Sequence, residues 1–190
     1  TPSFSGRTYA NVQIDAVGYS VSSTGGSPLS IDDLTITNGT QNLNLTGGIS
    51  IKGNISVAAG ATLGFSPATA NTLFFNGTAS QSINNLGTIS FNGNLNVNMN
   101  NATGLTLNTP ITLSGNLTFT AGVIYTNTTD LLTMTAGSSV SGASDASFVD
   151  GPVSKIGNTN FTFPVGKTNA GPSGSVNGIA AVAISNFVGG

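Results

Sequence analysis

A nine-residue pattern that occurs three times constrains the fold of this chain more than any other feature. The segment Ile49-Ser-Ile-Lys-Gly-Asn-Ile-Ser-Val57 returns as Ile89-Ser-Phe-Asn-Gly-Asn-Leu-Asn-Val97 and as Ile111-Thr-Leu-Ser-Gly-Asn-Leu-Thr-Phe119. The second copy starts 40 positions after the first, and the third starts 22 positions after the second. This spacing predicts coils of about 20 residues with one copy skipped, a period that solenoid proteins use.

Apolar and small polar side chains alternate within and around these copies, which predicts β-strands. Typical bursts are Leu34-Thr35-Ile36, Leu43-Asn44-Leu45 and Leu105-Thr106-Leu107, and a period of two places alternate side chains on opposite sides of a strand. The bursts end at Gly or Asn-Gly, which favour turns. Because proline cannot donate to a strand ladder, we expect prolines between the bursts or at their ends, as at positions 67, 110, 152, 164 and 172.

One coil of this kind is too small to fold by itself. Its few inward aliphatic side chains bury too little apolar surface to offset the entropy lost when the coil is ordered. Stacked coils share ladder hydrogen bonds and cover each other's apolar layers, so stability requires several coils together. We therefore expect an all-β fold in which residues 1–142 form a β-solenoid, similar to a parallel β-helix. Outward Asn and Thr side chains would align in columns, where Asn side chains can form amide-to-amide hydrogen bonds.

The sequence changes character near Ser141, and we expect a boundary there. Residues 145–155 and 160–167 contain three of the ten Phe and two of the four basic residues, and they do not continue the repeat. Residues 143–190 are therefore expected to form a small C-terminal β module. Its apolar last segment, residues 178–188, predicts a strand that either covers the solenoid end or pairs with another chain.

The ends of such a solenoid suggest a function, because both ends expose open strand ladders. The surface also carries little charge that would oppose association. The leading hypothesis is a structural subunit of an extracellular filament or adhesive surface fibre, which assembles with copies of itself end to end or by strand addition. The residues expected at these contacts are apolar side chains near both termini: Phe4, Tyr9, Ile179, Val182, Ile184, Phe187 and Val188.

Charged residues make up only 5% of the chain, and this excludes several classes of partner. The four Lys and Arg residues are scattered, so the chain lacks the basic stripe that nucleic acid requires and the polybasic patch that anionic lipid requires. No run approaches the ~18 consecutive apolar residues of a membrane helix. We expect neither nucleic acid binding nor membrane insertion.

The residue types of most catalytic sites are missing or scattered, so we expect no enzyme. Histidine and cysteine are absent, which excludes Ser-His-Asp and Cys-His nucleophilic sites. Ser154 and Lys155 are neighbours in an expected strand, where adjacent side chains point to opposite faces and cannot form a dyad. Asp32 and Asp33 would diverge in the same way, and the chain has no Glu to complete a carboxylate pair for glycoside cleavage.

Metal and cofactor sites are likewise not expected. Asp145 and Asp150 lack the Asp-x-Asp spacing of a calcium site, and Asp150-Gly151 is interpreted as a turn. An alternative function is a glycan-binding or ice-binding module of a monomeric surface protein, with a face lined by Thr and Asn. The Thr-x-Thr triplets that could order water do not recur once per coil, which favours ordinary strand surfaces; they are Thr35/Thr37, Thr118/Thr120 and Thr133/Thr135.

Besides the Gly-Asn turns, four segments of the chain form a distinctive set: Phe4-Ser-Gly-Arg-Thr-Tyr-Ala10, Gly104-Leu-Thr-Leu-Asn108, Ser147-Phe-Val-Asp-Gly-Pro-Val-Ser-Lys155 and Phe161-Thr-Phe-Pro-Val-Gly-Lys167. With these segments the chain resembles the repeat regions of very large secreted surface proteins of Bacteroidota, which are usually exported by the type IX secretion route. The resemblance covers nearly the whole chain and implies an extracellular, cell-surface location and an adhesin or filament component without an enzyme site.

Overall fold

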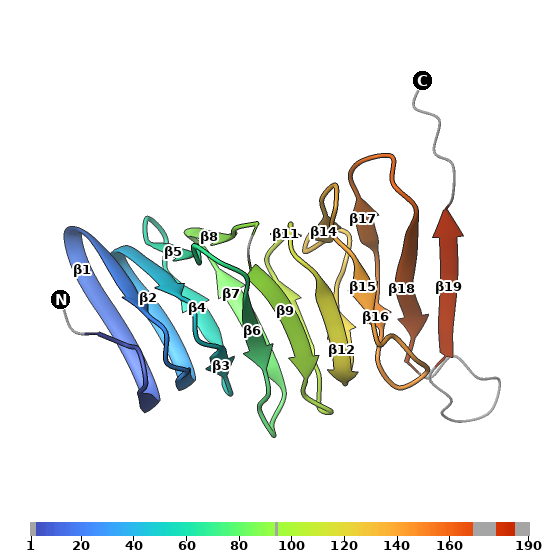
Figure 1. Ribbon diagram of the computed structural model, residues 1–190. Helices are drawn as coiled ribbons and strands as arrows, with labels where there is room; N and C mark the ends of the chain where they lie inside the picture. Colours follow the sequence, from blue (N-terminus) through green and yellow to red (C-terminus); the bar gives the residue numbers. More distant parts are fainter. Residues whose placement is uncertain (1–2, 94, 169–177, 185–190) are drawn as a thin grey trace.

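The computed structural model describes residues 3–93, 95–168 and 178–184. Every regular element in these residues is a β-strand, from β1 (Thr8–Gly25) to β19 (Gly178–Ile184). The prediction of an all-β fold is therefore confirmed. Figure 1 shows the strands side by side along an elongated body, with β1 at one end and β19 at the other.

The strands stack in three columns, because each turn of the chain passes through straight segments separated by corners. We call the columns face A, face B and face C, in the order in which the chain visits them. β1 and β2 (Leu29–Leu45) are long enough to pass through all three faces. From there each face receives one short strand per turn, and the chain makes about seven turns.

Face A continues with β3 (Ile49–Ile51), β6 (Asn71–Phe75), β9 (Leu95–Asn100), β12 (Leu117–Ala121) and β15 (Val140–Ser141). Face B continues with β4 (Ile55–Val57), β7 (Gln81–Asn85), β10 (Leu105–Asn108), β13 (Ile124–Tyr125), β16 (Val149–Asp150) and β18 (Phe161–Lys167). Face C continues with β5 (Thr62–Phe65), β8 (Thr88–Phe91), β11 (Ile111–Leu113), β14 (Leu132–Met134) and β17 (Val153–Lys155). All these pairings are parallel, so the fold is the predicted parallel β-solenoid.

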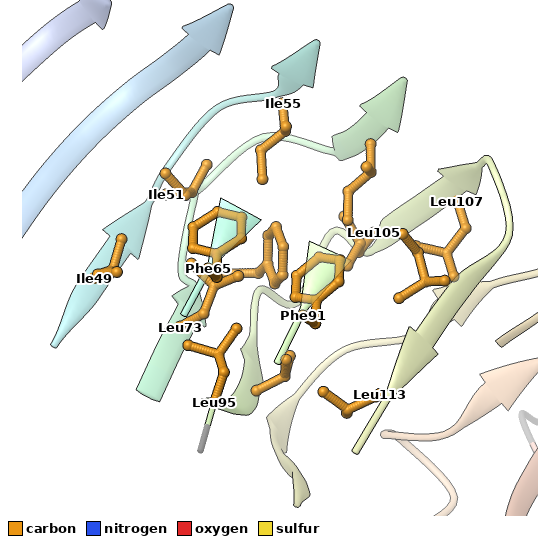
Figure 2. Close-up of a cluster of buried hydrophobic side chains, with 14 of the residues drawn as sticks. Ile49, Ile51, Ile55, Phe65, Leu73, Phe91, Leu95, Leu105, Leu107 and Leu113 are labelled. Atoms are coloured by element: carbon orange, nitrogen blue, oxygen red, sulfur yellow. The ribbon is translucent and has the colours of Figure 1, made fainter. Parts of the chain in front are cut away.

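The core lies inside the three faces and is built from alternate residues of every strand. Ile49, for example, pairs with Leu29 in the turn before and with Leu73 in the turn after, and all three are fully buried. Figure 2 shows such inward side chains from successive turns, including the rings of Phe65 and Phe91. These two rings stack with centroids 5.4 Å apart. Each apolar layer is thus covered by its neighbours, as the small size of a single coil requires.

The three copies of the sequence repeat do not occupy equivalent places, which corrects the prediction that one copy was skipped. The first copy joins β3 to β4 across the A–B corner, whereas the second and third join β8 to β9 and β11 to β12 across the C–A corner. Ile49 pairs with Leu73, and Leu73 with Val97, so Ile49 is in register with Val97 rather than with Ile89. The repeat encodes two strands and the corner between them, and corners of similar geometry occur at more than one place in each turn.

The length of a turn also varies, because the corners contain different numbers of residues. From Leu29 to Ile49 the coil takes 20 residues, whereas from Ile55 to Ile83 it takes 28. The strands keep their registers despite this difference, since the extra residues lie in the corners between them. The predicted period of about 20 residues therefore lies at the lower end of these two turn lengths.

Asparagine and glutamine side chains bond along the stack, which confirms the expected amide-to-amide contacts. On the outside of face B, Asn108 donates from Nδ2 to Oδ1 of Asn84, at 2.8 Å. At the A–B corner, buried Asn101 donates from Nδ2 to Oε1 of buried Gln81, at 2.9 Å. Gln81 in turn donates to the carbonyl oxygen of Ile51, one turn earlier. These bonds satisfy polar groups that the corner would otherwise bury without partners.

Parallel stacking continues across the expected boundary between residues 142 and 143. β16 pairs with β13 and β17 pairs with β14, so these strands extend faces B and C. The direction changes only at β19, which pairs antiparallel with β18. Pro164 lies within β18 rather than beside a strand, contrary to expectation. β18 pairs with β16 only through Val165 and Gly166, so that contact does not need the amide hydrogen that Pro164 lacks.

Candidate functional site at the two ends of the solenoid

The N-terminal end of the solenoid is formed by β1, which has one paired and one unpaired edge. β1 pairs in parallel with β2 along all three faces. Among the described residues, no strand pairs with its other edge, which forms the end of the body in Figure 1. Unpaired backbone N–H and C=O groups along 18 residues offer a template for another strand.

The inward side chains of β1 form an apolar layer that is only partly covered. Val12 and Ile14 are half-buried, whereas Leu34 and Ile36, their partners in β2, are 1% and 0% exposed. The difference arises because, among the described residues, β2 has a layer on both sides and β1 has a layer on one side only. The apolar side chains of β1 therefore keep surface that is unfavourable to expose to water.

The predicted assembly residues Phe4 and Tyr9 lie together at this end. Their rings meet edge to face with centroids 5.6 Å apart, and both are half-buried against the core. Sequence reasoning missed Val12 and Ile14, although the alternation in Val12-Gln13-Ile14 is the same signal that marked the other strands. The partly covered apolar layer at this end therefore includes more residues than the two aromatic ones that the sequence analysis named.

The C-terminal end is covered by β18, which crosses the last strands of all three faces. β18 contacts β15, β16 and β17, and its Phe161 is only 6% exposed. Phe163 packs edge to face on Phe161, with centroids 4.9 Å apart. The ammonium group of Lys155 lies 5.1 Å from the centroid of the Phe161 ring. This end of the core is thus capped by side chains, unlike the N-terminal end.

Lys155 points toward the end of the core rather than outward. It pairs with Met134, which is fully buried, while its neighbour Ser154 pairs with the outward Thr133. Its Nζ donates to the carbonyl oxygen of Thr135 and burial lowers the pKa of this ammonium group. Ser154 and Lys155 therefore face opposite ways, as the sequence analysis expected of strand neighbours.

Asp150 fastens the end of β18 to face B. Its carboxylate is 6% exposed, accepts a bond from Lys167 Nζ at 3.0 Å, and accepts two bonds from Thr168. Burial by itself raises the pKa of the Asp150 carboxyl, but the bonds from Thr168 and Lys167 outweigh it and hold that pKa below its ordinary value of 3.8. Asp150 is thus the buried member of an ion pair, a role that its interpretation as part of a turn did not include.

β19 provides the second free edge. It pairs with β18 along its whole length, with Gly178 opposite Lys167 at one end and Ile184 opposite Phe161 at the other. Among the described residues, no strand pairs with its other side. The backbone positions of Ile179, Val182 and Ile184 lie in this strand, so these predicted assembly residues are at the opposite end from Phe4 and Tyr9. Phe187 and Val188 lie outside the described residues.

The Thr-x-Thr triplets do not share a surface. Thr35 and Thr37 lie in the face B part of β2, Thr118 and Thr120 lie in β12 on face A, and Thr133 lies in β14 on face C. An ice-binding plane needs such triplets repeated on one flat face, so these three triplets do not form one.

The two adjacent acidic candidates, Asp32 and Asp33, differ in their surroundings. Asp33 accepts a hydrogen bond from the backbone N–H of Asn54 at 2.6 Å, which holds the next A–B corner. Asp32 is exposed. Within residues 3–93 and 95–168, no three His, Cys, Asp or Glu side chains are placed to hold a metal ion together.

The described part of the chain contains no helix of the length and apolarity that crossing a membrane would require. Comparison of the chain with protein-family models, with curated proteins and with solved structures returned no match.

Proposed function

We propose that this chain is a structural subunit of an extracellular filament or adhesive surface fibre, and that it assembles through the two ends of its solenoid. The observation that carries the proposal is the N-terminal end, where an unpaired strand and a half-covered apolar layer coincide. Another layer would complete both the ladder hydrogen bonds and the apolar packing. The location outside the cell rests on the resemblance to secreted surface proteins.

The sparse edge protection of β1 supports this proposal. Native proteins guard a free edge with charges, prolines, short strands or bulges. β1 has one bulge, at residues 16–19, and the register is regular on either side of it, in residues 8–14 and 20–25. β1 has 18 residues, and Asp15 is its only charged residue. The strand also contains no proline. An edge of this length and composition favours pairing with another strand.

The direction of the strands supports head-to-tail contact between β19 of one copy and β1 of the next. β1 runs parallel to the stacked strands that follow it, and β19 runs antiparallel to β18. If two copies share an axis and a direction, and the face B segment of β1 lies over β19 of the other copy, these two strands are antiparallel. Antiparallel pairing through short extended segments is a common mode of strand addition.

The proposal is tested by placing a charge in the apolar layer of β1. Val12→Lys puts an ammonium group into the layer that a neighbouring copy would cover, and we expect filaments to be lost in negative-stain electron micrographs and in sedimentation velocity. Gln13→Lys adds the same charge on the exposed outer side of the same strand and should leave filaments unchanged.

We expect both variants to keep the fold, because Val12 is half-buried rather than a core residue. Circular dichroism and thermal melting check this. A wild-type chain that remains monomeric at high concentration would contradict the proposal. If Val12→Lys and Gln13→Lys assemble equally well, the apolar layer of β1 does not take part in assembly, and that part of the proposal is wrong.

A further inference from the structure

The first turn of the solenoid has an enlarged corner between faces B and C. Asp15 pairs with Asn38 and Ser20 pairs with Thr40, so residues 16–19 stand opposite the single residue Gly39. The enlarged corner exposes two large apolar side chains on a surface where most side chains are small and polar. Tyr19 is 74% exposed and Val17 is 68% exposed.

A groove of about 460 Å³ lies beside Tyr19 and extends over the next two turns. The residues that line it include one glycine from each of three turns, Gly18, Gly39 and Gly60, which have φ angles of 75°, 74° and 78°. The backbone of the turn before covers Gly39. A Cβ atom at Gly60 would have no other atom within 4 Å, so the space above this residue is open. The groove is shallow and open to solvent. Its volume exceeds the roughly 300 Å³ at which pockets of small ligands begin, so one or two sugar rings have room to lie on this surface.

The polar groups of the groove are neutral side chains. Asn38 and Thr40 line it together with Ser20, and none of the four basic residues does. Asn38 donates from Nδ2 to Oδ1 of Asp15 at 2.9 Å, which fixes the orientation of its amide. Amide and hydroxyl groups match the hydroxyl groups of a saccharide, and the Asp15 carboxylate beside them repels an acidic ligand.

We propose that this groove binds a neutral saccharide, with one sugar ring stacked on Tyr19 and its hydroxyl groups bonded to Asn38, Thr40 and Ser20. An exposed aromatic ring next to hydrogen-bonding groups supplies the apolar and polar contacts that a pyranose presents. The site goes beyond the assembly function proposed above and does not depend on it. It gives the filament subunit, or a single copy, a means of holding a glycan.

The test measures the binding of cellobiose, maltose, lactose and chitobiose by saturation-transfer NMR and calorimetry, with glucuronic acid as the charged comparison. We expect at least one neutral disaccharide to bind and glucuronic acid not to bind. Tyr19→Ala should weaken the affinity by about tenfold, whereas Tyr19→Phe should keep most of it. Because Tyr19 is mostly exposed, neither variant should lose the fold.

Leu86→Ala is the matched control. Leu86 is 82% exposed at the same corner three turns later and lies outside the groove, so its loss removes exposed apolar surface without touching the site. Saccharide binding should be unchanged in this variant. All measurements use dilute wild-type and variant chains, so a chain that failed to form filaments would still give a valid binding result.

The proposal is overturned if none of the disaccharides binds at millimolar concentration, or if Tyr19→Ala binds as well as the wild type. It is also overturned if Tyr19→Ala and Leu86→Ala both reduce self-association in sedimentation velocity while no sugar binds. That result would assign the corner to a contact between copies of the chain.

Discussion

At the scale of single residues, the corners depend on glycines that serve two different needs. Gly39 and Gly60 both have φ near +75°, a conformation that costs an L-residue about 1–2 kcal/mol. Gly39 is also in close contact with the turn before it, because a Cβ atom there would lie 2.0 Å from the carbonyl oxygen of Ala16. Gly60 has no such neighbour. The same substitution at Gly39 and at Gly60 therefore distinguishes the cost of backbone strain from the cost of steric contact.

We predict that Gly39→Ala destabilises the fold by at least about 3 kcal/mol, because strain and a backbone clash add together. Gly60→Ala should cost only about 1 kcal/mol, because strain acts alone. Chemical denaturation monitored by circular dichroism gives both free energies of unfolding. Equal losses in the two variants would show that contact between neighbouring corners does not limit the choice of residue at Gly39.

At the scale of the elements, β18 is held in place by an ion pair whose carboxylate is buried, as well as by its phenylalanine residues. Asp150 in β16 binds Lys167 and Thr168, which end and follow β18. The folded-state pKa of Asp150 is lowered, so the carboxylate is favoured in the folded protein. Its contribution to stability is complete above the ordinary pKa of 3.8 and is lost as the pH falls through the lower folded value.

We predict that Asp150→Asn destabilises the protein by about 1–3 kcal/mol at neutral pH, because Asn carries no charge and has only one oxygen to accept the bonds that Thr168 and Lys167 donate to the carboxylate. The difference in melting temperature between this variant and the wild type should shrink as the pH falls below 3.8. Asp32→Asn removes the same charge from an exposed side chain and should have little effect at any pH. A constant difference for Asp150→Asn from neutral to strongly acidic pH would contradict the role of the carboxylate.

The strands themselves follow directly from local sequence, while their partners do not. The alternation in residues 49–51, 55–57 and 111–113 predicted β3, β4 and β11, and each is a strand with its apolar residues inward. The pairing of Ile49 with Leu73 could not be predicted, because the Gly-Asn corner pattern occurs at both the A–B and C–A corners. Pro164 shows the same limit, since its neighbours Val165 and Gly166, and not Pro164 itself, pair with β16, while Pro164 lies opposite Ala181 of β19.

At the scale of the whole molecule, a small cavity lies between the middle turns of the core. Its volume is about 30 Å³, and it is lined only by apolar side chains, which include Ile83, Phe91, Val97 and Leu107. Such a cavity has no polar partner for water, and its walls lose packing contacts across the gap. The added methylene group of a larger side chain could occupy this space.

We predict that Val97→Ile raises the free energy of unfolding by about 0.5–1 kcal/mol, because the added methylene fills the cavity. Val57→Ile makes the same change at a buried position that does not line the cavity, and should lower stability by about 1 kcal/mol through overpacking. Thermal and denaturant unfolding measure both changes. If both variants are destabilised alike, the core has no usable space at Val97.

The two ends also belong to this scale, because no local pattern distinguishes a covered end from an open one. The sequence placed apolar residues near both termini, and the expectation of contacts at Phe4 and Tyr9 remains a proposal. The structure adds that Val12 and Ile14 share this open layer, whereas Phe161 and Lys155 cap the other end. The two ends differ because β18 lies over the C-terminal end of the core, where it contacts β15, β16 and β17, one strand from each face.

The sequence by itself determined that this chain folds into short strands, turns at glycine and asparagine, and stacks its coils, because these properties depend on neighbours along the chain and on the size of one coil. Only the tertiary structure decided which bursts lie in register, which corner carries the groove beside Tyr19, and which end is capped. These features depend on contacts between residues of different turns, about 20 or more positions apart, and similar corners leave several alternatives nearly equal in local energy.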